Sequence, residues 1–245
     1  MKYNTTDIKS IGELLEYLNK HKDSNAPLWF RGQSNSNWNL EPKLMRIEPL
    51  PSESHYLNKF KQDATFILNN KPENEFEWMF LMQHYGVATR LLDWSESPLV
   101  SLYFALADET QKDEDGALWV LLPTELNKHN RYRPEFEFEI PSFEDDDLNN
   151  YLPSIISSER KTSLLPMAAI APRNSPRMQA QQGVFTISHR DNIYVNDAGS
   201  DPKHHIWKYN IPKEHKENLL NELTLLGINK FQLFPELGSL AENIK

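Results

Sequence analysis

The stretch FLMQHYGVATRLLDWSESPLVSLYFAL, residues 80–106, predicts two helices joined by a short polar connector. The first helix is expected over residues 75–85, and Gly86 takes a position at which helices commonly end. Pro98 suits the start of the second helix, residues 99–108, in which nearly every position is apolar. A helix that is apolar all round is usually buried, so we expect the second helix to lie in the core.

Outside this stretch, short apolar or alternating runs predict strands, and amphipathic runs predict further helices. The expected strands cover residues 28–30, 116–122, 167–171, 184–188, 205–211 and 231–234, and the further helices cover residues 11–18, 53–69 and 213–226. These elements mix without the regular alternation of a parallel βαβ fold. We therefore predict an α+β fold, a single domain over residues 1–245 in which helices flank a mixed or antiparallel core sheet.

The composition is that of an ordinary globular protein, with 39% hydrophobic and 25% charged residues among 245. No apolar run reaches the roughly 18 residues of a transmembrane helix, and the first 19 residues are too polar for a secretory leader. Cysteine is absent, which excludes disulfides, thiolate zinc sites and a cysteine nucleophile. We expect a cytoplasmic protein with no membrane partner.

Acidic residues are concentrated in one part of the chain. The formal net charge is −9, and residues 111–150 supply −7 of it, with 4 basic and 11 acidic side chains. Because runs of like charge resist packing, residues 125–150 are interpreted as an acidic insertion, of which residues 128–150 are expected to be dispensable for the core. The net charge also argues against general nucleic-acid binding, which depends on neutralising phosphates.

The first candidate for a binding site is the sequence FRGQ after the first expected strand. Phe30 and Arg31 are expected on opposite faces of the strand end, and Gly32 would let the backbone turn sharply beside Arg31. Such an arginine offers a planar fork to a phosphate or carboxylate, with Phe30, Gly32 and Gln33 around the ligand. The alternative is structural, with Arg31 paired to an internal carboxylate such as that of Asp93.

The second candidate is the sequence QHYG followed by TRLLDW, which gathers several polar side chains in the connector. His84 fits a hydrogen-bonding or acid–base role, Arg90 an anion clamp, and Asp93 the partner of that arginine. Tyr85 adds an aromatic ring. The alternative is again structural: Arg90 and Asp93 cap the turn, and His84 is an ordinary core residue.

The third candidate, residues 172–185, places arginines and glutamines just before an expected strand. Arg177 and Gln181 would share a face of a short helix, with Arg173 and Gln182 beside them. Five of the nine arginines in the chain lie in or beside the three candidate segments: Arg31, Arg46, Arg90, Arg173 and Arg177.

An acidic protein that concentrates its arginines in this way is expected to build an anion-binding pocket. We expect Arg31, Arg90 and Asp93 to lie within one polar cleft, because an arginine is costly to bury without a partner. The sequence contains no HExxH, CxxC or GxSxG motif and no EF-hand loop, so we expect no metal.

The candidate segments resemble the FRG domain, a family named for its Phe-Arg-Gly or Tyr-Arg-Gly tripeptide. The blocks WFRGQSNSNWNLEPKL and QHYG with TRLLDWSESP are similar to that family, as are PRNSPRMQAQQGVF and the closing LTLLGINKFQLFPELGSLA. Together these blocks span about residues 28–243, with the acidic insertion as the variable part. The combination of TRLLDW with QxGxF after an FRG start is specific, and on it the chain is identified as a member of the family.

The resemblance also implies a setting and a chemistry. FRG domains occur mostly in bacteria and their phages, often among mobile-element and defence genes, and their motif order is distantly similar to that of ADP-ribosyltransferases. On that analogy Arg31 holds the nicotinamide ribose or the pyrophosphate of NAD, Tyr85 stacks on the nicotinamide, and Arg90 holds the second phosphate. The sequence departs from the transferase pattern at Gln181 and Gln182, where a catalytic glutamate is usual.

The resemblance therefore implies an ADP-ribosyltransferase-like fold and a toxin or antiviral defence effector that transfers ADP-ribose from NAD or hydrolyses NAD. Arg31, His84, Tyr85 and Asp93 are the expected catalytic residues, with Asp93 or Glu159 replacing the missing glutamate. The alternative is a non-catalytic module that senses a nucleotide or a phage protein, and a nuclease is less favoured. The expected partners are a nucleotide-type small molecule and a protein target or phage component.

Overall fold

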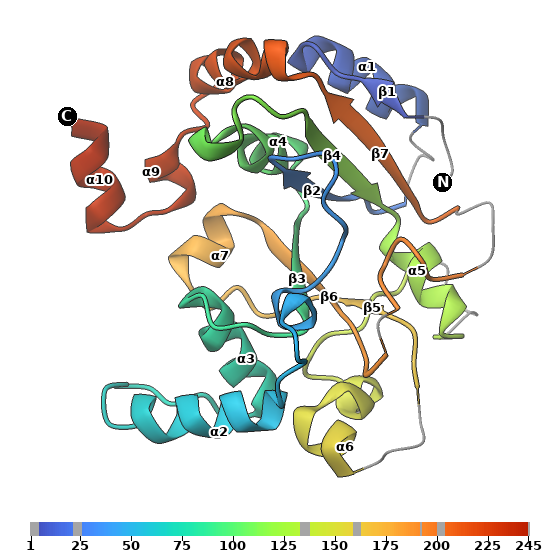
Figure 1. Cartoon of the computed structure of the whole chain (residues 1–245), viewed down its shortest axis with the longest axis vertical. Coiled ribbons are helices and arrows are strands. Elements are labelled where there is room, and N and C mark those ends of the chain that lie inside the picture. Colours follow the sequence, from blue (N-terminus) through green and yellow to red (C-terminus); the bar gives the residue numbers. More distant parts are fainter. Residues whose placement is uncertain are drawn as a thin grey trace.

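The computed structural model describes residues 5–21, 26–132, 138–158, 163–191, 193–199 and 204–244 (Figure 1). Within these residues, seven strands form one sheet in the order β1-β7-β4-β2-β3-β6-β5. The strands are β1 (Thr6–Asp7), β2 (Trp29–Gln33), β3 (Leu91–Ser95), β4 (Gly116–Leu121), β5 (Met167–Ala169), β6 (Gly183–Ile187) and β7 (Ile206–Ile211). Only β1 and β7 pair in parallel. The predicted α+β fold with a mixed sheet is confirmed.

Helices flank this sheet. They are α1 (Ile11–His21), α2 (Glu53–Ala64), α3 (Glu75–His84), α4 (Pro98–Leu106), α5 (Pro123–His129), α6 (Pro153–Ser158), α7 (Pro176–Ala180), α8 (Lys216–Leu225), α9 (Lys230–Leu233) and α10 (Leu237–Ile244). In Figure 1, α1 and α8 lie beside β7, and α2, α3 and α6 lie at the opposite end of the molecule. The apolar helix expected in the core is α4, which packs with α8 and the sheet. No described helix has the length and hydropathy needed to cross a membrane.

The connector predicted between α3 and α4 contains a central strand, so the expectation of a simple connector was wrong. β3 pairs with β6 through five residue pairs and lies in the interior of the sheet. Leu92 and Trp94 are buried on one face, and Leu91 is buried on the other. The strand pairs with residues about 90 positions later in the chain, and a run of five residues does not by itself distinguish a buried strand from another buried segment.

A second difference concerns residues 231–234, which were expected to form a strand. Helix α9 occupies Lys230–Leu233 instead. The side chain of Asn229 accepts a hydrogen bond from the backbone N–H of Gln232 at 3.0 Å, which caps the helix, and Leu233 is buried. A run of four residues is too short to reveal the helical period, so the sequence pattern gave the wrong element here.

The middle of the sheet is paired unevenly. Five residue pairs join β2 to β4, and five join β3 to β6, whereas β2 and β3 share the single pair Phe30 and Ser95. The sheet therefore has two well-paired halves, β1-β7-β4-β2 and β3-β6-β5, which meet at one position. We call the boundary between β2 and β3 the seam.

The described part of the acidic insertion is not wholly peripheral. Phe143 and Leu148 are buried, and the Phe143 ring centroid lies 5.1 Å from that of Phe80 and 6.3 Å from that of Phe185. Removing residues 135–147 would take Phe143 out of this aromatic cluster. We therefore expect such a deletion to destabilise the core, contrary to the expectation from charge alone. Residues 133–137 lie outside the described part, and the insertion boundaries remain a prediction.

Candidate functional site

A cleft of about 840 Å³ opens along the seam, lined by residues of β2, β3, α3 and α7. Nine of the twelve residues predicted for the site line it: Phe30, Arg31, Gly32, Gln33, His84, Tyr85, Asp93, Arg177 and Gln181. The other three, Arg90, Arg173 and Gln182, do not. The structure thus brings the three candidate segments together, although no spacing in the sequence required it.

Arg31 lies at the seam itself. Its Nη1 donates a hydrogen bond to the main-chain oxygen of Asp93 at 2.6 Å, and its buried Nε has no hydrogen-bond partner among the described residues. Burial lowers the pKa of Arg31, with the charge of Asp93 opposing this shift and that of Arg46 adding to it. A guanidinium carries five N–H donors and stays protonated in proteins. Apart from the bond made by Nη1, no hydrogen bond or ion pair of the Arg31 guanidinium is found among the described residues, and no carboxylate there is paired with it.

Asp93 presents a carboxylate from the β3 side of the cleft. This exposed side chain accepts a hydrogen bond from Nε2 of Gln83, on α3, at 2.8 Å. The side-chain amide oxygen of Gln83 in turn accepts a hydrogen bond from the hydroxyl of Thr89. Gln83 therefore orients the Asp93 carboxylate, a role that sequence analysis missed. The one available signal was the position of Gln83 in the QHYG sequence.

His84, Tyr85 and Arg177 lie together at the outer part of the cleft. The rings of His84 and Tyr85 meet edge to face with centroids 4.9 Å apart, and the Tyr85 side chain is 67% exposed. Partial burial, followed by the charge of Arg177, lowers the pKa of His84, while Glu236 opposes the shift. His84 is therefore neutral near pH 7 and able to accept a proton. The Arg177 guanidinium lies 4.6 Å from the ring centroid of Phe234.

Gly32 and Gln33 line the cleft mainly through structural roles. A side chain at Gly32 would place its Cβ 1.8 Å from the carbonyl oxygen of Ser101, so the glycine permits α4 to pack on β2. The sharp turn expected at Gly32 is absent, because β2 continues through Gln33. The Gln33 amide is occupied at both ends, accepting from Trp119 Nε1 at 2.7 Å and donating to the Asn39 carbonyl at 3.0 Å.

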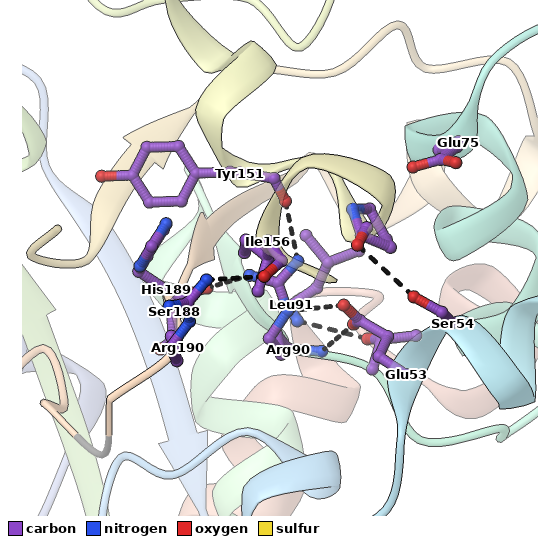
Figure 2. Close-up of polar contacts among 12 residues, drawn as sticks. Glu53, Ser54, Glu75, Arg90, Leu91, Tyr151, Ile156, Ser188, His189 and Arg190 are labelled. Carbon is purple, nitrogen blue, oxygen red and sulfur yellow. Dashed lines mark hydrogen bonds and ion pairs between the residues drawn. The ribbon is translucent and has the colours of Figure 1, made fainter. Parts of the chain in front are cut away.

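Arg90 lies outside the cleft in a closed polar site (Figure 2), so the expectation of one cleft holding Arg31, Arg90 and Asp93 was wrong for Arg90. Its Nε donates to Glu53 Oε2 at 2.6 Å, and both side chains are less than 10% exposed. Its Nη1 and Nη2 donate to the carbonyls of Ser188, at 2.6 Å, and Tyr151, at 2.7 Å. Every side-chain nitrogen of Arg90 is thus used within the fold, so Arg90 has a structural role, although it joins distant segments and does not cap the turn with Asp93 as the structural alternative had it.

Arg173 and Gln182 also lie away from the cleft lining. Arg173 pairs with Glu96 just after β3. Gln182 is exposed, adopts a φ of 47°, and accepts a hydrogen bond from the backbone of Glu96 through its carbonyl at 3.1 Å. Glu159, considered as a substitute carboxylate, lies outside the described residues. Asp93 is therefore the one carboxylate of that pair that the structure places at the cleft.

Among the cleft residues without a predicted role in binding, three are large or positively charged side chains from loop segments. Trp38 and Arg46 come from the segment between β2 and α2, and Lys71 comes from the loop between α2 and α3. Arg46 had been noted only as part of the arginine concentration, and nothing in the sequence pattern singles out Trp38. No cluster of three potential metal-ligating His, Asp or Glu side chains occurs in the described part of the chain.

Comparison with known proteins gives one match. Residues 26–114 match the family model of the FRG domain, a segment that includes β2, α3, β3 and α4. No curated protein and no solved structure matches the chain. The later blocks around Gln181 and at the closing residues lie beyond the matched segment. The tripeptide Phe30-Arg31-Gly32, the TRLLDW block and this match agree, and the segment of residues 26–114 is therefore assigned to the FRG domain family.

Proposed function

We propose that the cleft binds a phosphate-bearing nucleotide, and that the protein uses NAD there as a bacterial or phage toxin or defence effector. One observation carries this proposal. Arg31 and Asp93 face the same cleft as an unpaired cation and an exposed carboxylate, with only a main-chain hydrogen bond between them. In a structural ion pair the charges of Arg31 and Asp93 would neutralise each other, whereas in this arrangement both side chains can still interact with a ligand.

The charge of the cleft supports an anionic ligand. Four cationic and three acidic side chains line it: Arg31, Arg46, Lys71 and Arg177, against Glu41, Glu77 and Asp93. The formal balance is positive in a chain whose net charge is −9. An anion entering this cleft is therefore attracted locally although the molecule as a whole repels it.

The proposed reaction breaks the bond between nicotinamide and ribose. Nicotinamide leaves with the bonding electron pair, and an acceptor hydroxyl or water forms the new bond at the same ribose carbon and releases a proton. The Asp93 carboxylate supplies negative charge opposite the positive charge that develops on the ribose. Neutral His84 accepts the released proton, Arg31 holds a phosphate group, and Tyr85 offers its exposed ring to the nicotinamide.

A non-catalytic sensor is the second candidate, favoured by the residues near the usual catalytic glutamate. Gln181 is an amide whose Nε2 donates to the Leu233 carbonyl at 3.1 Å, and Gln182 lies outside the cleft. A sensor would use the same phosphate-binding arginine without turnover. The two candidates therefore differ in product formation and agree on binding.

The test pairs turnover with binding. Purified protein is incubated with NAD, released nicotinamide is measured by mass spectrometry, and ADP-ribose binding is measured by calorimetry. Replacing Arg31 with lysine keeps the charge but loses the planar fork, so Arg31→Lys should weaken ADP-ribose binding about ten- to a hundred-fold, nearly as much as Arg31→Ala. Asp93→Asn should stop nicotinamide release while ADP-ribose still binds.

The matched control is Arg131→Ala, which removes an exposed arginine outside the cleft and should change neither measurement. Thermal unfolding of each variant separates loss of fold from loss of binding. Normal ADP-ribose binding by a folded Arg31→Lys protein would remove Arg31 from the site. Saturable binding by the wild-type protein without any nicotinamide release would favour the sensor.

A further inference from the structure

Trp38 stands apart from the other tryptophans of this protein. All six lie in the described part of the chain, and the Trp38 side chain is 43% exposed, whereas the other five are at most 7% exposed. Trp38 also lines the cleft. A large apolar ring left in water gains most from a partner that covers it, and an aromatic ring of a ligand is such a partner.

The loop that carries Trp38 is firmly attached to the body of the protein. Lys216 Nζ donates to the Ser34 carbonyl at 2.7 Å, and Lys208 Nζ donates to the Ser36 carbonyl at 3.1 Å. On the far side of Trp38, the Gln33 side chain holds the Asn39 carbonyl at 3.0 Å. The exposure of the ring is therefore built into an anchored loop, which makes Trp38 a preorganised stacking surface.

Arg46 lies on the same stretch of chain and lines the same cleft. It is exposed, and no ion pair or hydrogen bond of its side chain is found within the described residues. Its charge is close enough to Arg31 to disfavour the protonated form of that side chain. Two unpaired arginines that repel each other across a cleft gain when a polyphosphate lies between them.

We propose that Trp38 and Arg46 form a second half-site, in which a purine base stacks on Trp38 and a phosphate lies between Arg46 and Arg31. The ligand is then a dinucleotide, with its second aromatic ring at Tyr85. This inference rests on the proposed function, because it assumes a nucleotide in the cleft. The cleft volume of about 840 Å³ lies toward the upper end of small-molecule sites, which suits a ligand of this size.

Two ligands separate the half-sites. ADP-ribose carries the adenine and both phosphates, whereas nicotinamide mononucleotide lacks the adenylate half. Calorimetric titrations with both ligands are carried out on the wild type, Trp38→Ala, Trp38→Phe and Arg46→Gln. Phe66→Ala is the control, because it removes an 88% exposed aromatic side chain outside the cleft lining.

We expect Trp38→Ala to weaken ADP-ribose binding roughly ten-fold, the loss typical of one stacked base, and to leave nicotinamide mononucleotide binding unchanged. Trp38→Phe should restore most of the affinity, and Arg46→Gln should again weaken ADP-ribose alone. In the wild type, ADP-ribose should also reduce quenching of tryptophan fluorescence by acrylamide, since Trp38 is the one exposed tryptophan. Phe66→Ala should match the wild type.

Equal effects of Trp38→Ala on both ligands, or no effect on ADP-ribose, would overturn the second half-site and leave the proposed function standing. If ADP-ribose binding depends on Trp38 but NAD is not cleaved, the half-site stands and the enzymatic proposal fails. If the wild type binds neither ligand, both proposals fall. Unchanged melting temperatures in the variants would show that each loss concerns binding.

Discussion

Arg90 is held by three partners in a site closed to solvent, and its removal should cost the fold a great deal. Arg90→Ala leaves Oε2 of the Glu53 carboxylate and two main-chain carbonyls without the donors they have now, and it leaves the Glu53 charge without its buried partner, so we expect a loss of about 3–5 kcal/mol in the free energy of unfolding. The matched control is Arg173→Ala, whose ion pair with Glu96 is 27% and 44% exposed and should contribute at most about 1 kcal/mol. Urea denaturation of both variants measures the difference.

The comparison would contradict the structure if the two variants lost similar stability. It also bears on function, because Arg90 was expected to hold a phosphate of the ligand. Since all its side-chain nitrogens are engaged within the fold, its effect on ADP-ribose binding should vanish in whatever fraction of Arg90→Ala remains folded.

The residues at the cleft show what the sequence could reveal at this scale. Arg31 and His84 were found because each stands close to a glycine in a motif segment, and Asp93 was found because it belongs to the TRLLDW segment, although it lies within strand β3 and not in a turn. The burial of Arg90 was not predictable, because its partner Glu53 precedes it by 37 residues and no sequence rule joins them. Trp38 was missed for a related reason: exposure is a property of the assembled surface, and five similar residues are buried.

Among the elements, the contact between β2 and α4 depends on the missing side chain of Gly32. A Cβ there would overlap the Ser101 carbonyl at 1.8 Å and the Ala105 amide nitrogen at 2.7 Å, both of which belong to the helix backbone. Gly32→Ala should therefore force α4 away from the sheet and destabilise the protein by about 4 kcal/mol or more, the range of severe overpacking.

The control for this prediction is Gly238→Ala in α10, where an added Cβ meets nothing within 4 Å. Alanine is the better helix former, so this variant should be neutral or up to about 1 kcal/mol more stable. Circular dichroism during thermal unfolding compares the two variants. A Gly32→Ala protein with the melting temperature of the wild type would show that α4 does not pack on β2 in this way.

The accuracy of the predicted elements followed the strength of their local signals. The helix before Gly86, the apolar helix after Pro98 and the strand beginning at Gly116 were recognised because length, period and terminating residues agreed. The strand β3 was missed because Leu91–Ser95 is short and buried on both faces, so its residues show no alternation. Helix α9 was mistaken for a strand because four residues are too few to show a helical period. Strand order was beyond reach, since pairing between β3 and β6 joins residues about 90 apart in sequence.

At the scale of the whole molecule, buried histidines should make stability depend on pH. Burial and the charge of Arg90 lower the pKa of His189, and the side chain is only 3% exposed. Between this lowered pKa and the ordinary value of 6.5, the unfolded chain binds more protons than the folded one. Stability is therefore lost as the pH falls below about 6.5, with a slope of up to about 1.4 kcal/mol per pH unit for one such group.

The measurement is urea denaturation at several pH values between about 5 and 7.5 for the wild type and His189→Gln. The variant should lose less stability on acidification, because glutamine cannot take up the proton. His55→Gln, which changes an exposed histidine on α2, should keep the wild-type slope. Identical slopes in all three proteins would remove His189 as a cause of acid sensitivity.

The single pair at Phe30 and Ser95 gives this sheet an uneven stiffness. Five residue pairs join β2 to β4 on one side of the seam, and five join β3 to β6 on the other. Each half of the sheet is therefore stiffer than the seam, and relative movement of the two halves is expected to concentrate there. The hydrogen bond from Arg31 to the main-chain carbonyl of Asp93 crosses the seam. A ligand that binds side chains from both halves would hold them together at the seam, where the sheet is paired least. Binding in the cleft would then reduce the motion of the two halves relative to each other and make the whole molecule more rigid.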